Sequence, residues 1–202
     1  MTASLCSLAA VALSSVVVFA QDPVTVDPVH YKLVLENAAV RVLSIDYPAG
    51  ATSRMHQHPD AIVVDFARES ATYTPAGVHN PTNIGTTPIT GLVVEFKTAA
   101  PGKATLPASR PGLTLNVLAE GLRAMAYRST ASATFAEPAG TKHDFDQVVI
   151  ALGPTQMALS IDGKPAKTTW ARGDAEFIGR GVAHEAKNTG GKPVDMIIVA
   201  IK

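Results

Sequence analysis

The sequence repeats itself, and this duplication restricts the folds open to it more than any other feature. Residues 47–64, YPAGATSRMHQHPDAIVV, share their order of residue types with residues 137–150, EPAGTKHDFDQVVI. A second pair of segments, 75–83 and 179–188, has a glycine-bearing turn, then a histidine, then an asparagine four residues later. Self-similarity of this kind predicts two related domains built on one plan.

A stretch rich in proline and glycine separates the two copies. Residues 98–112, TAAPGKATLPASRPG, contain three prolines and two glycines and show no apolar periodicity. Proline cannot donate to a β ladder, and glycine weakens helices and strands, so we interpret this segment as a linker. The expected organisation is an N-terminal domain over residues 21–97 and a C-terminal domain over residues 113–202.

The residues on both sides of the linker favour short strands. β-Branched residues are frequent and turn formers interrupt them at short intervals. The predicted strands are Val40–Tyr47, Ile62–Phe66, Gly91–Phe96, Leu113–Leu118, Val148–Leu152, Gln156–Ile161, Thr168–Trp170 and Val194–Ile201. Asp162-Gly163 predicts a tight hairpin turn. Only residues 119–125 show helical periodicity, so the predicted fold class is all-β.

Length and charge limit the kinds of partner. The 202 residues are 47% hydrophobic and carry a formal net charge of zero, so the chain can bury a sizeable core. No cluster of lysine and arginine is present, and such clusters are what bind nucleic acid or an anionic membrane surface. Composition therefore excludes these partners without selecting another.

The first twenty residues differ from the rest. Leu5–Ala20 is apolar with scattered serines, and the small-residue pattern before Gln21 resembles a cleavage site. We interpret residues 1–20 as a signal peptide of a secreted or periplasmic protein that has no membrane attachment after cleavage. The alternative is a buried N-terminal helix. The one cysteine, Cys6, lies in this segment, so the mature chain would have no disulfide.

The histidines predict a metal site. His56 and His58 stand one residue apart after a predicted strand, and alternate residues of a strand face the same side. His79 follows a Pro/Gly turn in the repeated frame and is the candidate third ligand. Three neutral nitrogens with open positions suit a divalent Fe, Mn, Ni or Zn ion. The alternative is a chance pair of exposed or core histidines.

Residues of both halves resemble the cupin sequence motifs. The first motif is matched by Gly50, His56 and His58, and the second by Pro75, Gly77, His79 and Asn83 in the first half and by Gly173, Gly179, Gly181, His184 and Asn188 in the second. The resemblance covers nearly all of the mature chain and is to a two-domain cupin, a bicupin. It implies two antiparallel β-barrel or jelly-roll sandwich domains, with His56, His58 and His79 as metal ligands.

Two departures from the cupin pattern affect the first half. The glutamate of the first motif would fall at Ile62 or Val63, neither of which can bind a metal. A site of three histidines without the carboxylate resembles the thiol dioxygenase and gentisate dioxygenase branches of the superfamily. Only twenty residues separate His58 from His79, against forty between His143 and His184, so the first domain is expected to lack a hairpin.

The second half keeps fewer of the motif ligands. Thr141 stands at the first histidine position, His143 at the second, Gln147 at the glutamate position and His184 at the last. His143, Gln147 and His184 form a candidate weak metal site, because an amide oxygen is a poor ligand for transition metals. The alternative for this half is a structural pocket or one that holds an organic ligand without metal.

Two functions follow from these residues. The first is an exported metal-dependent enzyme, a dioxygenase or isomerase acting on a small molecule, with the ion polarising an oxygen-bearing ligand. The second is a non-catalytic or structural bicupin that binds a small ligand, since fold alone does not establish activity. Pairing of β edges makes a homodimer possible in either case.

Overall fold

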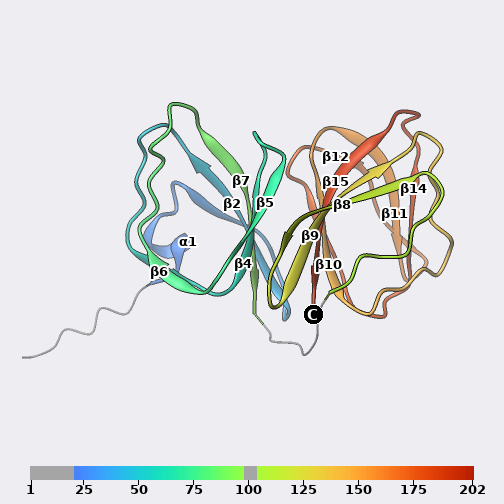
Figure 1. Cartoon of the computed structure of the whole chain (residues 1–202), viewed down its shortest axis with the longest axis horizontal. Coiled ribbons are helices and arrows are strands. Elements are labelled where there is room, and N and C mark those ends of the chain that lie inside the picture. The colour runs from blue at the N-terminus through green and yellow to red at the C-terminus, as the bar shows by residue number, and fades with distance from the viewer. Residues whose placement is uncertain (1–20, 98–103) are drawn as a thin grey trace, which may run out of the picture.

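The computed structural model describes residues 21–97 and 104–202, so the predicted signal peptide and the centre of the predicted linker lie outside it. The described chain folds almost wholly into strands, which form two sandwiches side by side (Figure 1). The all-β prediction is confirmed. Within the described residues, no helix is long and apolar enough to cross a membrane.

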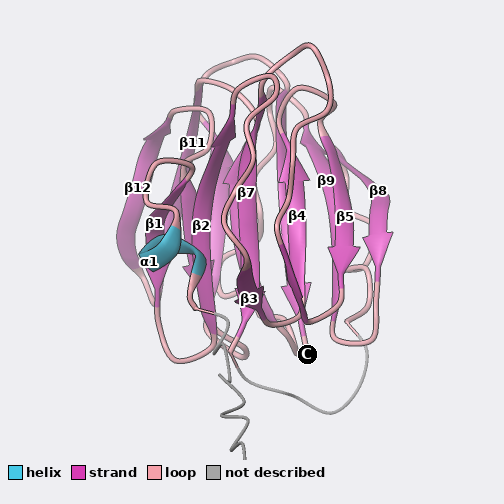
Figure 2. Ribbon diagram, turned by 90° about the vertical axis from the view of Figure 1, so that its left-hand side faces the viewer, coloured by secondary structure: helices cyan, strands magenta, loops and turns pink. Residues whose placement is uncertain are grey.

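The N-terminal sandwich has one large and one small sheet. The large sheet has the order β1-β2-β7-β4-β5 and the small sheet pairs β3 with β6, all antiparallel. The strands are β1 (Tyr31–Glu36), β2 (Val40–Tyr47), β3 (His56–His58), β4 (Ala61–Asp65), β5 (Ser70–Thr74), β6 (Gly77–His79) and β7 (Ile89–Phe96). The short helix α1 (Pro23–Val26) precedes them and lies against β1 (Figure 2).

The C-terminal sandwich has the same plan with a larger second sheet. Its five-stranded sheet has the order β13-β10-β15-β9-β8, and its second sheet has the order β12-β11-β14. The strands are β8 (Leu113–Glu120), β9 (Ala124–Ala131), β10 (Asp146–Ala151), β11 (Thr155–Ile161), β12 (Lys164–Trp170), β13 (Ala175–Ile178), β14 (His184–Asn188) and β15 (Val194–Ile201).

Strand register shows how the copies correspond. β2 pairs with β7 from Val40–Phe96 to Tyr47–Ile89, as β9 pairs with β15 from Ala124–Ile201 to Ala131–Val194. The neighbouring strands β4 and β10 join these ladders in equivalent positions. The duplication in the sequence is therefore a duplication of structure, and the central strands β2, β7 and β4 correspond in register to β9, β15 and β10.

The first domain lacks a hairpin, as the spacing of its histidines predicted. In the C-terminal sandwich, β11 pairs with β14 on one side and β12 on the other. The N-terminal counterpart of β14 is β6, which pairs only with β3 among the described strands. Val24 of α1 packs against the inner apolar cluster of Tyr31, Leu43 and their neighbours in this sandwich.

The largest apolar core lies between the two sandwiches. The five-stranded sheets pack back to back, and seventeen buried residues from both domains form one cluster there. Leu92 of β7 and Ile197 of β15 are 1% and 0% exposed within it. Polar bridges support the same contact, since Arg172 donates to the carbonyl of Phe66 and Arg128 pairs with Glu69.

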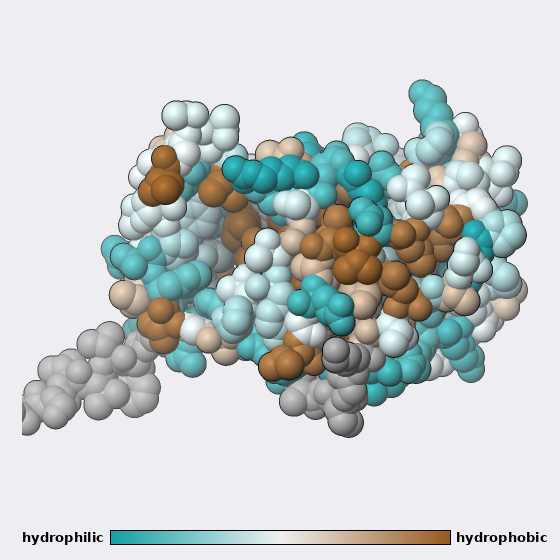
Figure 3. Space-filling model, viewed as in Figure 1, coloured by the Kyte–Doolittle hydropathy of each residue, from teal (hydrophilic) through white to brown (hydrophobic). Residues whose placement is uncertain are grey.

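This packing explains the residue pattern of the central strands. β10 and β15 are buried on both faces, one towards the other sandwich and one towards their own interior, so they are almost continuously apolar. The outer surface, by contrast, is mostly hydrophilic, with apolar side chains gathered near the middle of the face in Figure 3.

Local predictions had mixed outcomes. The Asp162-Gly163 turn is confirmed: both residues have positive φ, 50° and 71°, and they connect the antiparallel pair β11–β12. The helical periodicity over residues 119–125 was misleading, because this segment is the end of β8, a turn and the start of β9. Gly121 belongs to the turn, and a Cβ there would lie 2.1 Å from the ring of Tyr73.

Candidate functional site

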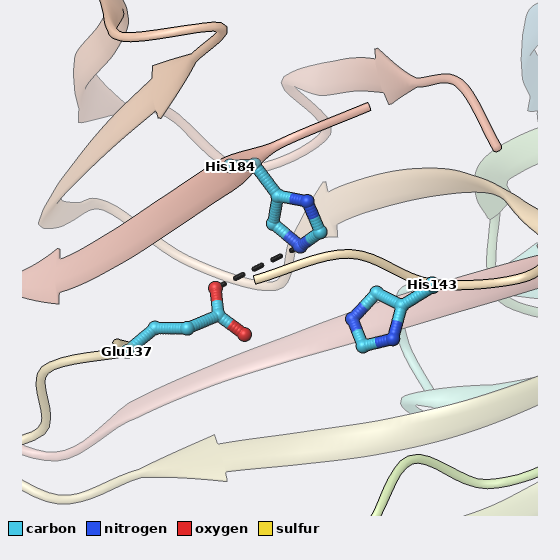
Figure 4. A group of neighbouring side chains, drawn as sticks. All are labelled: Glu137, His143 and His184. Carbon is cyan, nitrogen blue, oxygen red and sulfur yellow. Dashed lines mark ion pairs between the residues drawn. The ribbon is translucent and has the colours of Figure 1, made fainter. Parts of the chain in front are cut away.

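A turn in the C-terminal sandwich brings an acidic residue back to two histidines. Pro138-Ala-Gly140 reverses the chain, with Gly140 at φ 75° and the amide of Thr141 donating to the carbonyl of Pro138 over 3.3 Å. Backbone bonds then attach both arms of the turn to β14: Glu137 donates to Ala186 over 2.8 Å, and His184 donates to Thr141 over 2.9 Å. Glu137, His143 and His184 consequently converge (Figure 4).

These three side chains form a compact group of metal-binding atoms. One ligand atom from each of Glu137, His143 and His184 lies within 4.8 Å of the other two, the one such group in the part of the chain that the structure describes. Oε2 of Glu137 is 3.8 Å from Nε2 of His184, and the two imidazole centroids are 5.0 Å apart. The other carboxylate oxygen of Glu137 accepts from Arg110, which fixes the carboxylate in place.

Both imidazoles of this group are held in forms that suit a metal. The Nδ1–H of His184 donates to the carbonyl of Val182 over 3.2 Å, so its Nε2 carries the lone pair. Burial, with smaller effects from His184 and Arg110, lowers the pKa of His143 to about 4. His143 is therefore neutral near pH 7, and no proton competes for its nitrogen.

Gln147, predicted as a ligand, lies at the inner edge of the group. Its side chain is 4% exposed and its amide nitrogen donates to Nε2 of His184 over 3.2 Å. An ion can take Nε2 of His184 only after this amide hydrogen bond is broken, because the nitrogen has a single lone pair. Behind the group lies a cavity of about 90 Å³ whose walls are mainly apolar and include Tyr127, Met157 and Trp170.

The three histidines of the N-terminal sandwich also share one cavity. His56 and His79 are direct cross-strand partners on β3 and β6. The ring of His79 lies 4.8 Å from that of His56 and 4.6 Å from that of His58, measured between centroids. All three line a cavity of about 160 Å³. Their nitrogens do not reach the mutual 4.8 Å spacing of the C-terminal group, so their role as joint ligands stays a prediction.

The protonation of these histidines nevertheless fits a metal. The Nδ1–H of His56 donates to the carbonyl of Arg54 over 2.8 Å, and that of His58 donates to Pro59 over 2.7 Å, which leaves both Nε2 atoms unprotonated. Nε2 of His79 is buried without a hydrogen-bond partner. Burial and the two neighbouring histidines lower its pKa to about 4, so it too is neutral near pH 7.

A carboxylate missed by the motif comparison lies in the same cavity. In the N-terminal sheet, Ala61 of β4 pairs with Glu95 of β7. At the equivalent position of the second copy, Gln147 of β10 pairs with Ala200 of β15. The residue equivalent to Gln147 is therefore Ala61, not Ile62 or Val63. Glu95 is 3% exposed, lines the cavity and lies 2.9 Å from Nε of Arg41. Burial raises the pKa of Glu95, while Arg41 opposes that change. The N-terminal cavity thus has its buried polar side chain, Glu95, on β7, whereas the C-terminal cavity has Gln147 on β10, the counterpart of the adjacent strand β4.

Solved structures share this architecture. AerE from Microcystis aeruginosa has a TM-score of 0.67 and 14% identity over 91% of this chain and 97% of its own. Salicylate 1,2-dioxygenase from Pseudoaminobacter salicylatoxidans, in adducts with gentisate, has a TM-score of 0.58 and 11% identity over 81% of this chain and 68% of its own. A cupin 2 conserved barrel domain protein from Leptotrichia buccalis has a TM-score of 0.50 and 10% identity over 85% and 88%.

The chain has the cupin fold. No model of a protein family and no curated protein matches the sequence. Identities of 10–14% establish the fold alone, and the chemistry of this chain depends on its own side chains.

The sequence predicted the histidines of each cavity but missed the carboxylates of Glu137 and Glu95. Glu137 stands directly before a Pro-Ala-Gly turn, and its counterpart before the first turn is Tyr47, so the repeat itself concealed it. The motif asparagines Asn83 and Asn188 are both buried, and the side-chain amide of each donates to backbone carbonyls. His30 stacks on Tyr47, with the ring centroids 4.7 Å apart.

Proposed function

We propose that this cupin is an exported, metal-dependent protein that binds a small organic molecule at a divalent transition-metal ion in its C-terminal barrel. The observation that carries the proposal is the group of Glu137, His143 and His184, whose ligand atoms lie within 4.8 Å of one another. Arg110 holds the outer oxygen of Glu137, which leaves Oε2 on the side of the histidines. Ligands oriented by such outer contacts are typical of metal centres.

The donor set narrows the choice of metal. Two imidazoles and one carboxylate with open positions suit Fe(II), and the same atoms accept Mn(II), Ni(II) or Zn(II). When bound, such an ion supplies a Lewis acid that polarises an oxygen-bearing ligand or takes part in oxidation. The carboxylate of Glu137 adds a negative charge that the neutral amide of Gln147 cannot supply. The site therefore binds a cation more tightly than the predicted set of His143, Gln147 and His184.

The cavity favours a small, largely apolar ligand. Aromatic and aliphatic side chains form most of its wall, and its polar lining residues include Glu137, His143 and His184. A ligand with one oxygen-bearing group and an apolar body satisfies both parts. The similarity in fold to a dioxygenase solved with gentisate supports oxidation or isomerisation of a small aromatic or aliphatic acid as the reaction class.

Metal analysis tests this proposal. The chain without residues 1–20, loaded with Fe(II) or Zn(II) and dialysed, is expected to keep bound metal, and Glu137→Gln is expected to lose the C-terminal equivalent. Glu185→Gln is the matched control, because Glu185 neighbours His184 on β14 and faces the opposite side of the strand. Equal metal content in the two variants would refute Glu137 as a ligand.

The N-terminal histidines are the second candidate for metal binding, as the sequence predicted. The observation in their favour is the buried, unpartnered Nε2 of His79 beside the unprotonated Nε2 atoms of His56 and His58. The double variant His56→Ala/His58→Ala is expected to lose one metal equivalent that Glu137→Gln retains. If EDTA leaves the melting temperature unchanged while a small organic acid raises it, the chain is instead a non-catalytic binding protein.

Export remains a proposal that rests on the apolar stretch Leu5–Ala20. Expression of the full chain in a host with a secretion pathway, followed by mass determination of the extracytoplasmic protein, is expected to give a chain that begins at Gln21. Retention of intact residues 1–20 on a cytoplasmic product would refute it.

A further inference from the structure

The hydroxyl of Tyr31 occupies the nitrogen that His56 would offer to a metal. We propose that Tyr31 is a positioning residue that holds Nε2 of His56 in the metal-free protein and, once an ion takes that nitrogen, is free to donate to a small carboxylate ligand in the same cavity. This inference deepens, and rests on, the three-histidine candidate described above.

The direction of the hydrogen bond follows from the second ring nitrogen. Nδ1 of His56 lies 2.8 Å from the carbonyl of Arg54 and must donate to it, because a carbonyl can only accept. Nε2 of the neutral ring is therefore an acceptor, and the Tyr31 hydroxyl, 3.1 Å away, is the donor. A lone pair used in this way is unavailable to a metal ion.

The two side chains are fixed in this contact by burial. Tyr31 is 6% exposed and His56 is 1% exposed, and their rings meet edge to face with centroids 5.1 Å apart. Tyr31 also meets the ring of Tyr47 edge to face at 5.7 Å. Because Tyr31 lines the cavity, its hydroxyl would lie near a carboxylate bound there once an ion holds Nε2 of His56.

The three histidines are unequal as a result. Nε2 of His79 has no partner, whereas Nε2 of His56 is engaged. An ion must break the Tyr31 bond before all three nitrogens can bind it. Removal of the hydroxyl should therefore tighten metal binding by about two- to twelve-fold, the equivalent of a net hydrogen bond of about 0.5–1.5 kcal/mol.

The duplicated domain provides an internal comparison. Tyr31 pairs with Ile45 on β2, and the same register in the second copy pairs Leu115 with Ser129 on β9. Leu115 also lines its own cavity. Thr141 pairs with His184 as His56 pairs with His79, so a threonine stands at the position of His56 in the second copy. The tyrosine is thus present in the copy with three histidines, and an apolar residue replaces it in the copy where that histidine is absent.

The test uses Co²⁺ as the metal probe and benzoate as the carboxylate probe. Both are titrated calorimetrically into the chain without residues 1–20, in a Glu137→Gln background that removes the proposed C-terminal ion. Tyr31→Phe is expected to bind Co²⁺ about two- to twelve-fold more tightly and, once loaded, to bind benzoate several-fold more weakly. Tyr73→Phe is the matched control, because its hydroxyl bonds to Asp60 over 2.9 Å outside the cavity, and it should change neither affinity.

The outcomes separate this inference from the proposed metal site. Unchanged or weaker Co²⁺ binding by Tyr31→Phe overturns the role of Tyr31 while the three histidines stand. Equal Co²⁺ uptake by the wild type and His56→Ala/His58→Ala overturns both. Tighter Co²⁺ binding without weaker benzoate binding removes the second half of the proposal. Tyr31→Leu, which copies Leu115, replaces Tyr31→Phe if the latter does not fold.

Discussion

Replacement of Ile197 by alanine should destabilise both sandwiches together. Ile197 is 0% exposed and contributes to the apolar cluster shared by β15 and the N-terminal sheet. Truncation of a buried isoleucine to alanine costs about 2–5 kcal/mol, and a site walled by two paired sheets relaxes little, so we expect about 3–4 kcal/mol. Since small domains are stable by only about 5–15 kcal/mol, this loss is large.

Urea unfolding and hydrogen exchange measure this effect in different parts of the molecule. Trp170, the single tryptophan, is 1% exposed in the C-terminal interior and reports on that sandwich by fluorescence. Exchange of the amides of β2 and β7, followed by mass spectrometry, reports on the other. Ile84→Ala, at a side chain 94% exposed, is the control and should stay within about 0.5 kcal/mol of wild type. Loss of C-terminal stability with unchanged protection of β2 and β7 would refute a shared core.

Three further changes have defined outcomes. Gly91→Ala would place a Cβ 1.9 Å from the carbonyl of Val64 on the adjacent strand, so we expect a loss of several °C in melting temperature or no soluble protein. Asn188→Ala should lower the free energy of unfolding by about 2–4 kcal/mol, measured by urea denaturation, because two backbone carbonyls lose their buried donor. The pKa values of His79 and His143, about 4, lie below those of unfolded imidazoles near 6.5, so the unfolded chain takes up protons first. The metal-free protein should therefore lose stability as the pH falls from about 6.5 towards 4, seen as falling urea midpoints.

The strands that the sequence predicted well are those with both faces buried. β2 and β15 match their predicted bounds, Val40–Tyr47 and Val194–Ile201, because most of their residues are apolar and most of their side chains are buried or half-buried. β1 and β12 lie at the edges of their sheets, and most of their residues are exposed, so polar residues such as Lys32, Glu36 and Lys167 interrupt the apolar signal. The helical periodicity near Ala119 failed for a related reason, since a hairpin turn interrupted two strands in a window too short to resolve them.

The site could be predicted only as far as the motif residues. His143 and His184 came from the repeated frame, and the structure places them 5.0 Å apart between ring centroids. Glu137 and Glu95 could not be found in this way, because their places depend on a chain reversal and on which strand neighbours which. Strand pairing in the folded protein brings such residues together, and this pairing cannot be deduced from residue spacing along the sequence.

The back-to-back arrangement of the sheets has a consequence for how the two copies could diverge. On its own, the shortened N-terminal barrel would expose the apolar outer face of its five-stranded sheet to water. Small domains have low stability, so the cost of this exposure would be a large fraction of the total. Here the second barrel is tethered to the first and covers that sheet at high effective concentration. The intact unit thus serves as a permanent support, which frees the reduced unit to vary its loops and pocket residues.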